Sequence, residues 1–154
     1  MKYRMLSKEQ FEELHEEFAL FLASQEIDST EWTDIKKNRP KVAEQEMQIF
    51  SDVVWDRVLG SANYLDHLSP KSLNLFKVEG TNFHRILIKI DRDINLNVEE
   101  DYKWLFDNLS HASVSIFKAT KEFGEDYKQE IFDLIQKGAE LSKGLVFEAI
   151  SERL

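Results

Sequence analysis

The fold is decided by Leu73-Asn74-Leu75-Phe76-Lys77-Val78, the polar run Glu79-Gly80-Thr81-Asn82, and Phe83-His84-Arg85-Ile86-Leu87-Ile88-Lys89-Ile90. The two outer runs are rich in strand-forming residues and flank a short turn-like segment, which predicts a β-hairpin over residues 72–90. A two-residue turn at Gly80-Thr81 and a four-residue loop over residues 79–82 give the same register. In that register, four facing pairs are predicted: Val78 with Phe83, Lys77 with His84, Leu75 with Ile86, and Leu73 with Ile88.

This register sorts the hairpin side chains onto two faces. The first face is predicted to be core, and it collects Leu73, Leu75, Ile86, Ile88 and Ile90, with Lys77 and His84 near the turn. The second face mixes apolar, aromatic and basic residues: Asn74, Phe76, Val78, Phe83, Arg85, Leu87 and Lys89. Two alternatives stay open for it. Helices of the N-terminal region cover it, with their glutamates meeting Arg85 and Lys89, or it is exposed and binds a partner.

The rest of the chain is mostly helical by its periodicity. About three helices are predicted before residue 61, over residues 7–25, 28–37 and 40–60, and the segment 61–71 is predicted to be a connector. A strand is predicted at residues 113–120, with further helices near residues 98–109, 125–137 and 145–150. The order strand, helix, strand predicts that this third strand runs parallel to the second. The expected fold class is therefore α+β, with a helical N-terminal region packed with a small mixed sheet and C-terminal helices.

Length and composition set broad limits. The 154 residues suit a single domain over 1–154, with a helical region at 1–60 and a sheet-containing region at 61–154. There is no cysteine, which excludes disulfides and thiolate chemistry. The net charge of −9 disfavours nucleic acid and anionic membranes as partners. Residues 71–92 are locally basic in spite of this charge.

The sequence gives no sign of export or membrane insertion. The chain starts with Met1-Lys2-Tyr3-Arg4-Met5-Leu6 and continues directly into charged residues, so no secretion leader is expected. No apolar run approaches the ~18 residues that a membrane span requires. We therefore expect a cytoplasmic protein.

Catalytic and metal-binding patterns are incomplete. Glu12 and His15 have the i, i+3 spacing of helical metal ligands, but a di-metal site needs a second such pair, and a solvated acidic face is favoured. Asp66, His67 and Ser69 have the residue types of a nucleophilic triad, yet triads are defined by geometry rather than adjacency. We assign no catalytic residue, no metal ligand and no cofactor.

Several blocks along the chain resemble a family of short acidic proteins of unknown function from Bacteroidota. These blocks are the opening Met1-Lys2-Tyr3-Arg4 with Leu6-Ser7-Lys8-Glu9-Gln10, Glu13-Leu14-His15-Glu16-Glu17-Phe18, Glu31-Trp32, Ile35-Lys36-Lys37-Asn38, Phe50-Ser51-Asp52, Val54-Trp55 and Ser69-Pro70-Lys71. The resemblance spans nearly the whole chain and implies a bacterial, cytosolic, single-domain protein. It implies no activity for any residue.

Two functional hypotheses follow. The favoured one is a non-enzymatic acidic protein-interaction module, with a protein as its partner and with Phe76, Phe83 and Arg85 as the binding residues. The alternative is a small enzyme that uses acid/base residues such as His67, His84 or Asp66 in a cleft between the helical region and the sheet. The composition leaves a homo-oligomer open.

Overall fold

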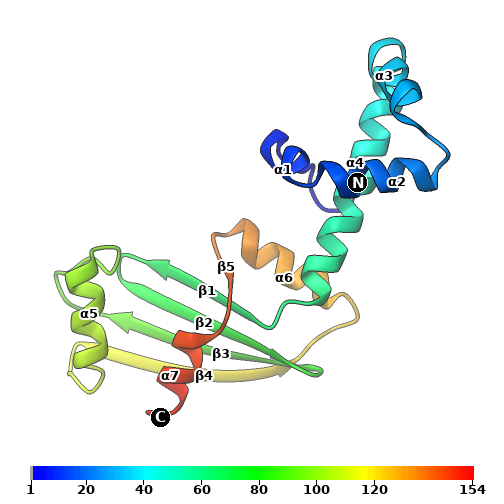
Figure 1. Ribbon diagram of the computed structural model, residues 1–154. Helices are drawn as coiled ribbons and strands as arrows, with labels where there is room; N and C mark the ends of the chain where they lie inside the picture. The colour runs from blue at the N-terminus through cyan, green and yellow to red at the C-terminus, as the bar shows by residue number, and fades with distance from the viewer. Residues whose placement is uncertain (1) are drawn as a thin grey trace. The chain divides into compact units, whose positions relative to one another are not determined.

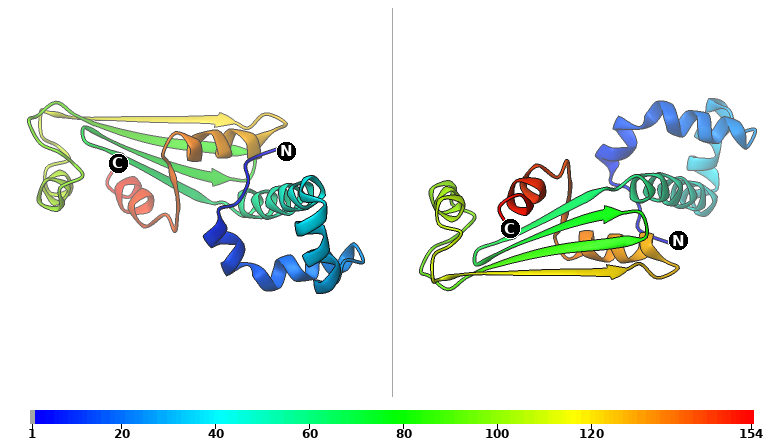
Figure 2. Two further views of the ribbon diagram at one scale, coloured as in Figure 1. Left: turned by 90° about the horizontal axis from the view of Figure 1, so that it is seen from above. Right: turned by 90° about the horizontal axis from the view of Figure 1, so that it is seen from below.

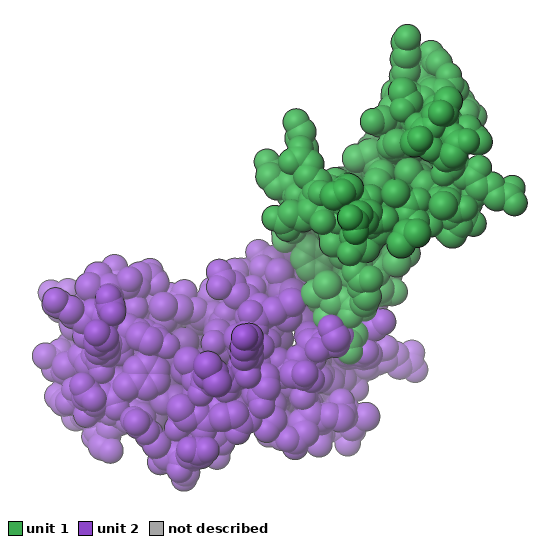
Figure 3. Space-filling view, viewed as in Figure 1, with its two compact units in different colours: residues 1–60 green, residues 61–154 purple. Residues whose placement is uncertain are grey.

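A computed structural model describes residues 2–154, which form seven helices and one five-stranded sheet (Figure 1). The predicted α+β class is confirmed. The chain divides into two compact units, Met1–Gly60 and Ser61–Leu154, which are coloured separately in Figure 3. The first unit is helical and the second holds all five strands. That the two units make up one domain stays a prediction.

The first unit contains the four helices α1 (Lys8–Glu13), α2 (His15–Ser24), α3 (Ser29–Asn38) and α4 (Pro40–Gly60). Local sequence signals explain their starts. Ser7 and Gln10 form a reciprocal capping box at α1. The Asp28 carboxylate accepts a hydrogen bond from the Glu31 N–H at 2.8 Å and so caps α3. Pro40 occupies the first position of α4, where its missing N–H removes no helical bond.

The prediction of one helix over residues 7–25 is wrong at one residue. Leu14 has φ −100° and ψ 22°, outside the helical region, and it separates α1 from α2. The apolar spacing continues across this point, because Phe11 and Phe18 still meet edge to face with ring centroids 5.4 Å apart. A hydrophobic pattern therefore does not reveal a change confined to one pair of backbone angles.

The second unit is built on a sheet with the strand order β4-β3-β2-β1-β5. Its strands are β1 (Tyr64–Ser69), β2 (Ser72–Glu79), β3 (Asn82–Ile90), β4 (Val114–Glu122) and β5 (Glu140–Ser142). The hairpin and its register are confirmed at all four predicted pairs, among them Val78 with Phe83 and Leu75 with Ile86. The turn is the two-residue form, since Glu79 pairs with Asn82, and Gly80 adopts a φ of 59° that favours glycine.

The predicted parallel orientation of the third strand is wrong. β4 pairs antiparallel with β3, and Ile90 at the end of one faces Val114 at the start of the other. A parallel return would have to carry the chain back along β3, which is roughly 30 Å long at 3.3 Å per residue. The intervening helix α5 (Glu99–Asp107) has nine residues, or roughly 14 Å, and it lies at the end of the sheet (Figure 1). The chain therefore re-enters the sheet at the end it left, and the sheet is wholly antiparallel.

The segment predicted as a connector contains a strand. β1 pairs antiparallel with β2, joined by the two residues Pro70 and Lys71, and Ser69 faces Ser72. Proline is common at the first central position of a turn, so a Pro-Lys pair between two short runs is compatible with a hairpin. β5 pairs antiparallel with β1 and adds to its free side.

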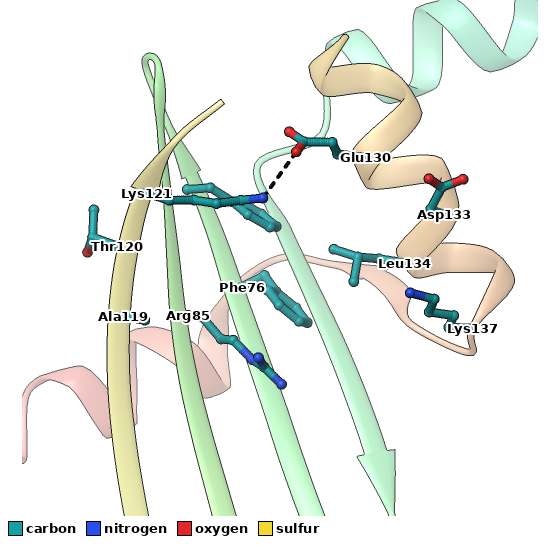
Figure 4. Close-up of a pocket in the computed structure, with 10 residues that line it drawn as sticks. Phe76, Arg85, Ala119, Thr120, Lys121, Glu130, Asp133, Leu134 and Lys137 are labelled. Atoms are coloured by element: carbon teal, nitrogen blue, oxygen red, sulfur yellow. Dashed lines mark hydrogen bonds and ion pairs between the residues drawn. The ribbon is translucent and has the colours of Figure 1, made fainter. Parts of the chain in front are cut away.

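Helices lie on both faces of the sheet (Figure 2). On the first face, the predicted core residues pack with Leu105 of α5 and with Phe147 and Ile150 of α7 (Leu145–Ser151). The second face carries α6 (Tyr127–Gln136) near the hairpin turn, and Figure 4 shows α6 beside Phe76. Among residues 2–154, none of the helices combines the length and apolar character needed to cross a membrane.

Candidate functional site

A cavity of about 420 Å³ opens on the second face between the strands β2, β3 and β4 and the helix α6. Figure 4 shows its lining. Ten residues surround it: Phe76, Phe83, Arg85, Ala119, Thr120, Lys121, Glu130, Asp133, Leu134 and Lys137. All three residues that the sequence analysis proposed for binding are therefore in one place. Their predicted role in binding stays a prediction.

Phe76 and Phe83 make the apolar floor of the cavity. They come from neighbouring strands, two residues out of direct register and therefore on the same face, because Phe76 faces Arg85 and Phe83 faces Val78. Their rings stack with centroids 5.3 Å apart and an interplanar angle of 9°. Phe83 also touches Phe123, at 4.7 Å between centroids, beyond the end of β4. Both floor residues are buried, so only part of each ring faces the cavity.

Arg85 is exposed at the rim and is held by its neighbours. Its guanidinium donates hydrogen bonds to the Asn74 side-chain oxygen, from Nε at 3.1 Å and from Nη2 at 2.5 Å. The same guanidinium lies 5.7 Å from the centre of the Phe76 ring, within cation–π range. Because the Asn74 amide is neutral, these hydrogen bonds do not neutralise the positive charge of Arg85.

The opposite rim comes from α6 and carries carboxylates. Glu130 Oε1 pairs with the Lys121 ammonium at 3.0 Å, which links the helix to β4. Glu130 Oε2 is shielded from solvent and has no hydrogen-bond partner in residues 2–154. Lys137 lines the cavity near the C-terminal end of the same helix. The α6 rim is therefore mixed in charge, whereas the strand side is purely basic.

The strand residues of the second face include no carboxylate. Reading the alternation from the register, this face carries Ser115, Phe117, Ala119 and Lys121 of β4, Phe83, Arg85, Leu87 and Lys89 of β3, Ser72, Asn74, Phe76 and Val78 of β2, Leu65, His67 and Ser69 of β1, and Leu141 of β5. Arg85, Lys89 and Lys137 form no ion pair within the described chain. Arg85 and Lys137 line the cavity, and Lys89 lies further along the same face. In a protein with 29 acidic residues, these three unpaired cations give the second face a surface suited to negative charge.

The first face has a separate polar network near the hairpin turn. The Glu148 carboxylate of α7 accepts hydrogen bonds from Lys77 at 2.8 Å and from the Tyr64 hydroxyl at 2.7 Å. The hydrogen bond from Lys77 lowers the pKa of Glu148, and the bond to Glu148 raises the pKa of Tyr64. Lys77 is also 3.3 Å from Glu79, and its pKa is raised by both glutamates. Because Tyr64 and Lys77 of the sheet both bond Glu148, this network joins α7 to the sheet.

The residues considered for catalysis do not converge. Asp66 lies on the first face and His67 on the second, because adjacent strand residues point to opposite sides. Asp66 accepts a hydrogen bond from the Ser142 hydroxyl at 3.0 Å, and burial raises the pKa of its carboxyl. His84 bonds Thr120 Oγ1 at 2.8 Å, near the other end of the sheet. No triad geometry links Asp66, His67 and Ser69.

The helical metal pattern also stays incomplete. The His15 ring bonds the backbone carbonyl of Glu12 at 2.9 Å, so Nδ1 is engaged with the main chain. Among residues 2–154, no group of three or more histidine and carboxylate residues is placed to hold a metal ion.

A model for a family of unknown function, DUF6495, matches residues 1–154. The chain belongs to this family. The resemblance to a family of unknown function is thus confirmed over the whole length. No curated protein and no solved structure matches the chain. Membership of DUF6495 carries no assigned reaction or ligand.

Sequence reasoning found the strand side of this cavity and missed the helical side. It placed a helix at residues 125–137, close to α6, but did not place that helix over the second face. The remaining lining residues come from α6 and its C-cap: Glu130, Asp133, Leu134 and Lys137. The available signal was the apolar run Phe123, Tyr127, Ile131, which follows β4 directly and brings the helix back over the adjacent strands.

Proposed function

We propose that this protein is a non-enzymatic interaction module of the bacterial cytoplasm, which binds an acidic segment of another protein on the second face of its sheet. Phe76, Phe83 and Arg85 are the central contact residues. The bacterial assignment is supported by the resemblance of the sequence blocks. The binding assignment is supported by the geometry and charge of the cavity.

The observation that carries the proposal is a cavity with an apolar floor and two unpaired cations, Arg85 and Lys137, in its rim, on a chain with a net charge of −9. Surface cations in acidic proteins usually have carboxylates near them. Here Arg85 instead bonds a neutral amide and Lys89 lies 5.9 Å from the Phe117 ring. An acidic partner would supply the missing negative charge, and nucleic acid would meet repulsion from the rest of the chain.

The arrangement suggests how such a segment binds. An apolar side chain of the partner enters the cavity and packs on the parts of the Phe76 and Phe83 rings that form its floor. A carboxylate two positions along an extended segment then reaches Arg85, whose planar guanidinium suits bidentate pairing. Leu87 and Phe117 extend the apolar surface toward Lys89, so alternating acidic and apolar residues fit this face.

Two features favour this reading over the enzyme alternative. The acid/base candidates Asp66, His67 and His84 are spread over two faces of the sheet. The polar groups of the cavity, by contrast, are a charged rim around an apolar floor, which is the usual anatomy of an interaction surface.

The test uses fluorescently labelled short peptides that alternate Glu with Leu or Phe, and matched peptides with Lys in place of Glu. Binding to the full chain is measured by fluorescence anisotropy. We expect the acidic peptides to bind, and the affinity to fall as salt is added. Arg85→Glu should weaken binding by tenfold or more, equivalent to about 1.4 kcal/mol, because it replaces an attractive charge with a repulsive one at the centre of the surface.

Lys103→Glu is the matched control. This substitution makes the same change of charge on α5, where the Lys103 side chain is exposed and pairs with Glu99 at 3.2 Å. It should leave peptide affinity nearly unchanged. Equal binding of the acidic and basic peptides, or equal losses in the two variants, would remove the support for an acidic partner on the second face.

A further inference from the structure

β4 is a long open edge of the sheet. It has nine residues and its strand partner is β3 alone. Seven of the nine residues are exposed, and Phe117 is 54% exposed. Figure 2 shows β4 at the border of the sheet, with no other strand of the unit outside it. The opposite edge is β5, which has only three residues.

The register identifies which backbone groups of this edge are unpaired. The Asp91 N–H donates to the Ser113 carbonyl at 2.8 Å, and the Phe123 N–H donates to the Thr81 carbonyl at 2.9 Å. In an antiparallel ladder, hydrogen-bonded pairs alternate with non-bonded pairs. The odd-numbered residues of β4 therefore point their backbone groups toward β3. Ile116, Lys118, Thr120 and Glu122 point their N–H and C=O groups outward, which makes eight unpaired groups.

We propose that a second copy of this chain pairs with this edge, β4 against β4 and antiparallel, to form one continuous sheet across a two-fold axis. Such a dimer interface is isologous, so each copy presents the same residues. This inference does not depend on the proposed function, because it concerns the edge of the sheet and not the cavity.

Hydrogen bonding and charge select the register of the pair. Residues with outward-pointing backbone groups must face residues of the same kind in the second copy. This requirement allows the two-fold axis to pass through residue 118, 119 or 120, near the centre of the strand. An axis at 118 would set Lys118 against Lys118 of the second copy, and like charges in direct opposition are destabilising. An axis at 120 leaves Ile116 opposite residue 124, beyond the end of β4.

An axis at Ala119 satisfies every requirement. Lys118 then faces Thr120 of the second copy and Ile116 faces Glu122, so all eight outward groups of each copy find partners. On the second face, the exposed ring of Phe117 lies opposite Lys121 of the second copy, a cation and an aromatic ring in cross-strand contact. Ala119 meets its own counterpart at the axis, where the small side chain permits close approach.

The absence of cysteine makes a direct test available. Ala119→Cys places one thiol on the axis, in a non-hydrogen-bonded pair whose Cα atoms are roughly 4.5 Å apart, within the range of a disulfide. Under mild oxidation we expect a covalent dimer of twice the 18.1 kDa chain on a non-reducing gel. Lys121→Cys is the control, because the two copies of residue 121 are separated by four residues along the ladder, or roughly 14 Å.

The mass in solution tests the proposal without oxidation. Sedimentation equilibrium of the wild-type chain should give the mass of two chains. Lys118→Pro removes an outward N–H while leaving the β3–β4 bonds intact and should give a single-chain mass, whereas Lys118→Ala should remain dimeric. Circular dichroism verifies that the proline variant is folded. A wild-type mass of one chain, or equal cross-linking of the two cysteine variants, would overturn the proposal.

Discussion

Phe83 connects the floor of the cavity to the packing of the second unit. Its ring is 7% exposed and lies between Phe76 and Phe123. Truncation leaves a void that the stacked rings cannot fill, so we expect Phe83→Ala to lower the free energy of unfolding by about 3–5 kcal/mol. Urea denaturation measures this change through the midpoint of unfolding. Loss of stability, rather than loss of a contact alone, is the expected first effect.

Leu145→Ala is the control for that substitution. Leu145 is 77% exposed on α7, and its truncation should change the free energy of unfolding by no more than about 0.5 kcal/mol. If Phe83→Ala had as small an effect as Leu145→Ala, the ring would not be part of the core. The second face would then be open at the hairpin turn.

The ionisation of Glu148 should make the stability of the fold depend on pH. Because the hydrogen bond from Lys77 lowers the pKa of Glu148, its contribution is complete above the ordinary value of 4.5 and is lost as pH falls through the lowered pKa. Glu148→Gln should therefore reduce the urea midpoint at neutral pH. The difference from wild type should shrink when both proteins are measured well below pH 4.5. Glu152→Gln is the control at an exposed position just after the same helix, and it should leave the urea midpoint nearly equal to that of wild type at both pH values.

At the scale of elements, the hairpin was predictable and its surroundings were not. The register from Leu73 to Phe83 follows from alternation and turn chemistry, both of which are local. The direction of β4 depends on where α5 packs, which is a tertiary property. β1 was missed because Asp66 and His67 weaken the apolar alternation, and its partner β2 supplies the pairing that makes it a strand. The α6 side of the cavity was missed because the choice of helix that covers a sheet face is also a tertiary property.

Gly138 controls the turn between α6 and β5. It has a φ of 116°, and a Cβ atom there would lie 2.9 Å from Nε2 of His67. We expect Gly138→Ala to cost about 1–3 kcal/mol of stability, because the alanine would be strained and would displace the imidazole. Thermal unfolding followed by circular dichroism measures the loss. Gly124→Ala is matched to it, since no atom lies within 4 Å of the added methyl group, and it should be nearly neutral.

At the scale of the whole molecule, the three tryptophans report on the two units separately. Trp32 and Trp55 belong to the first unit and Trp104 to the second. If the chain is one cooperative domain, a Trp104→Phe variant and a Trp32→Phe/Trp55→Phe variant should give the same midpoint by fluorescence as by circular dichroism. Each midpoint is compared with that of wild type by circular dichroism, which corrects for any destabilisation by the substitution. Two separated fluorescence midpoints would show that the units unfold independently.

Acidic and basic side chains are segregated within the chain. Residues 1–60 carry 8 basic and 13 acidic side chains, whereas the strand residues of the second face carry only basic ones. The proposed acidic segment would be repelled by residues 1–60 and attracted to the second face. The first face offers no comparable surface, since Glu148 and Glu79 neutralise Lys77.

The most direct measurement is an NMR titration of the isotope-labelled full chain with an acidic peptide that alternates Glu and Phe. Backbone amide shifts should concentrate at Phe76, Phe83, Arg85 and Lys89, on the second face, and should diminish as salt is added. Amides of α5 and α7, behind the first face, should move little. Shifts confined to residues 1–60 or to the first face, or no shifts at peptide concentrations in large excess, would contradict the account.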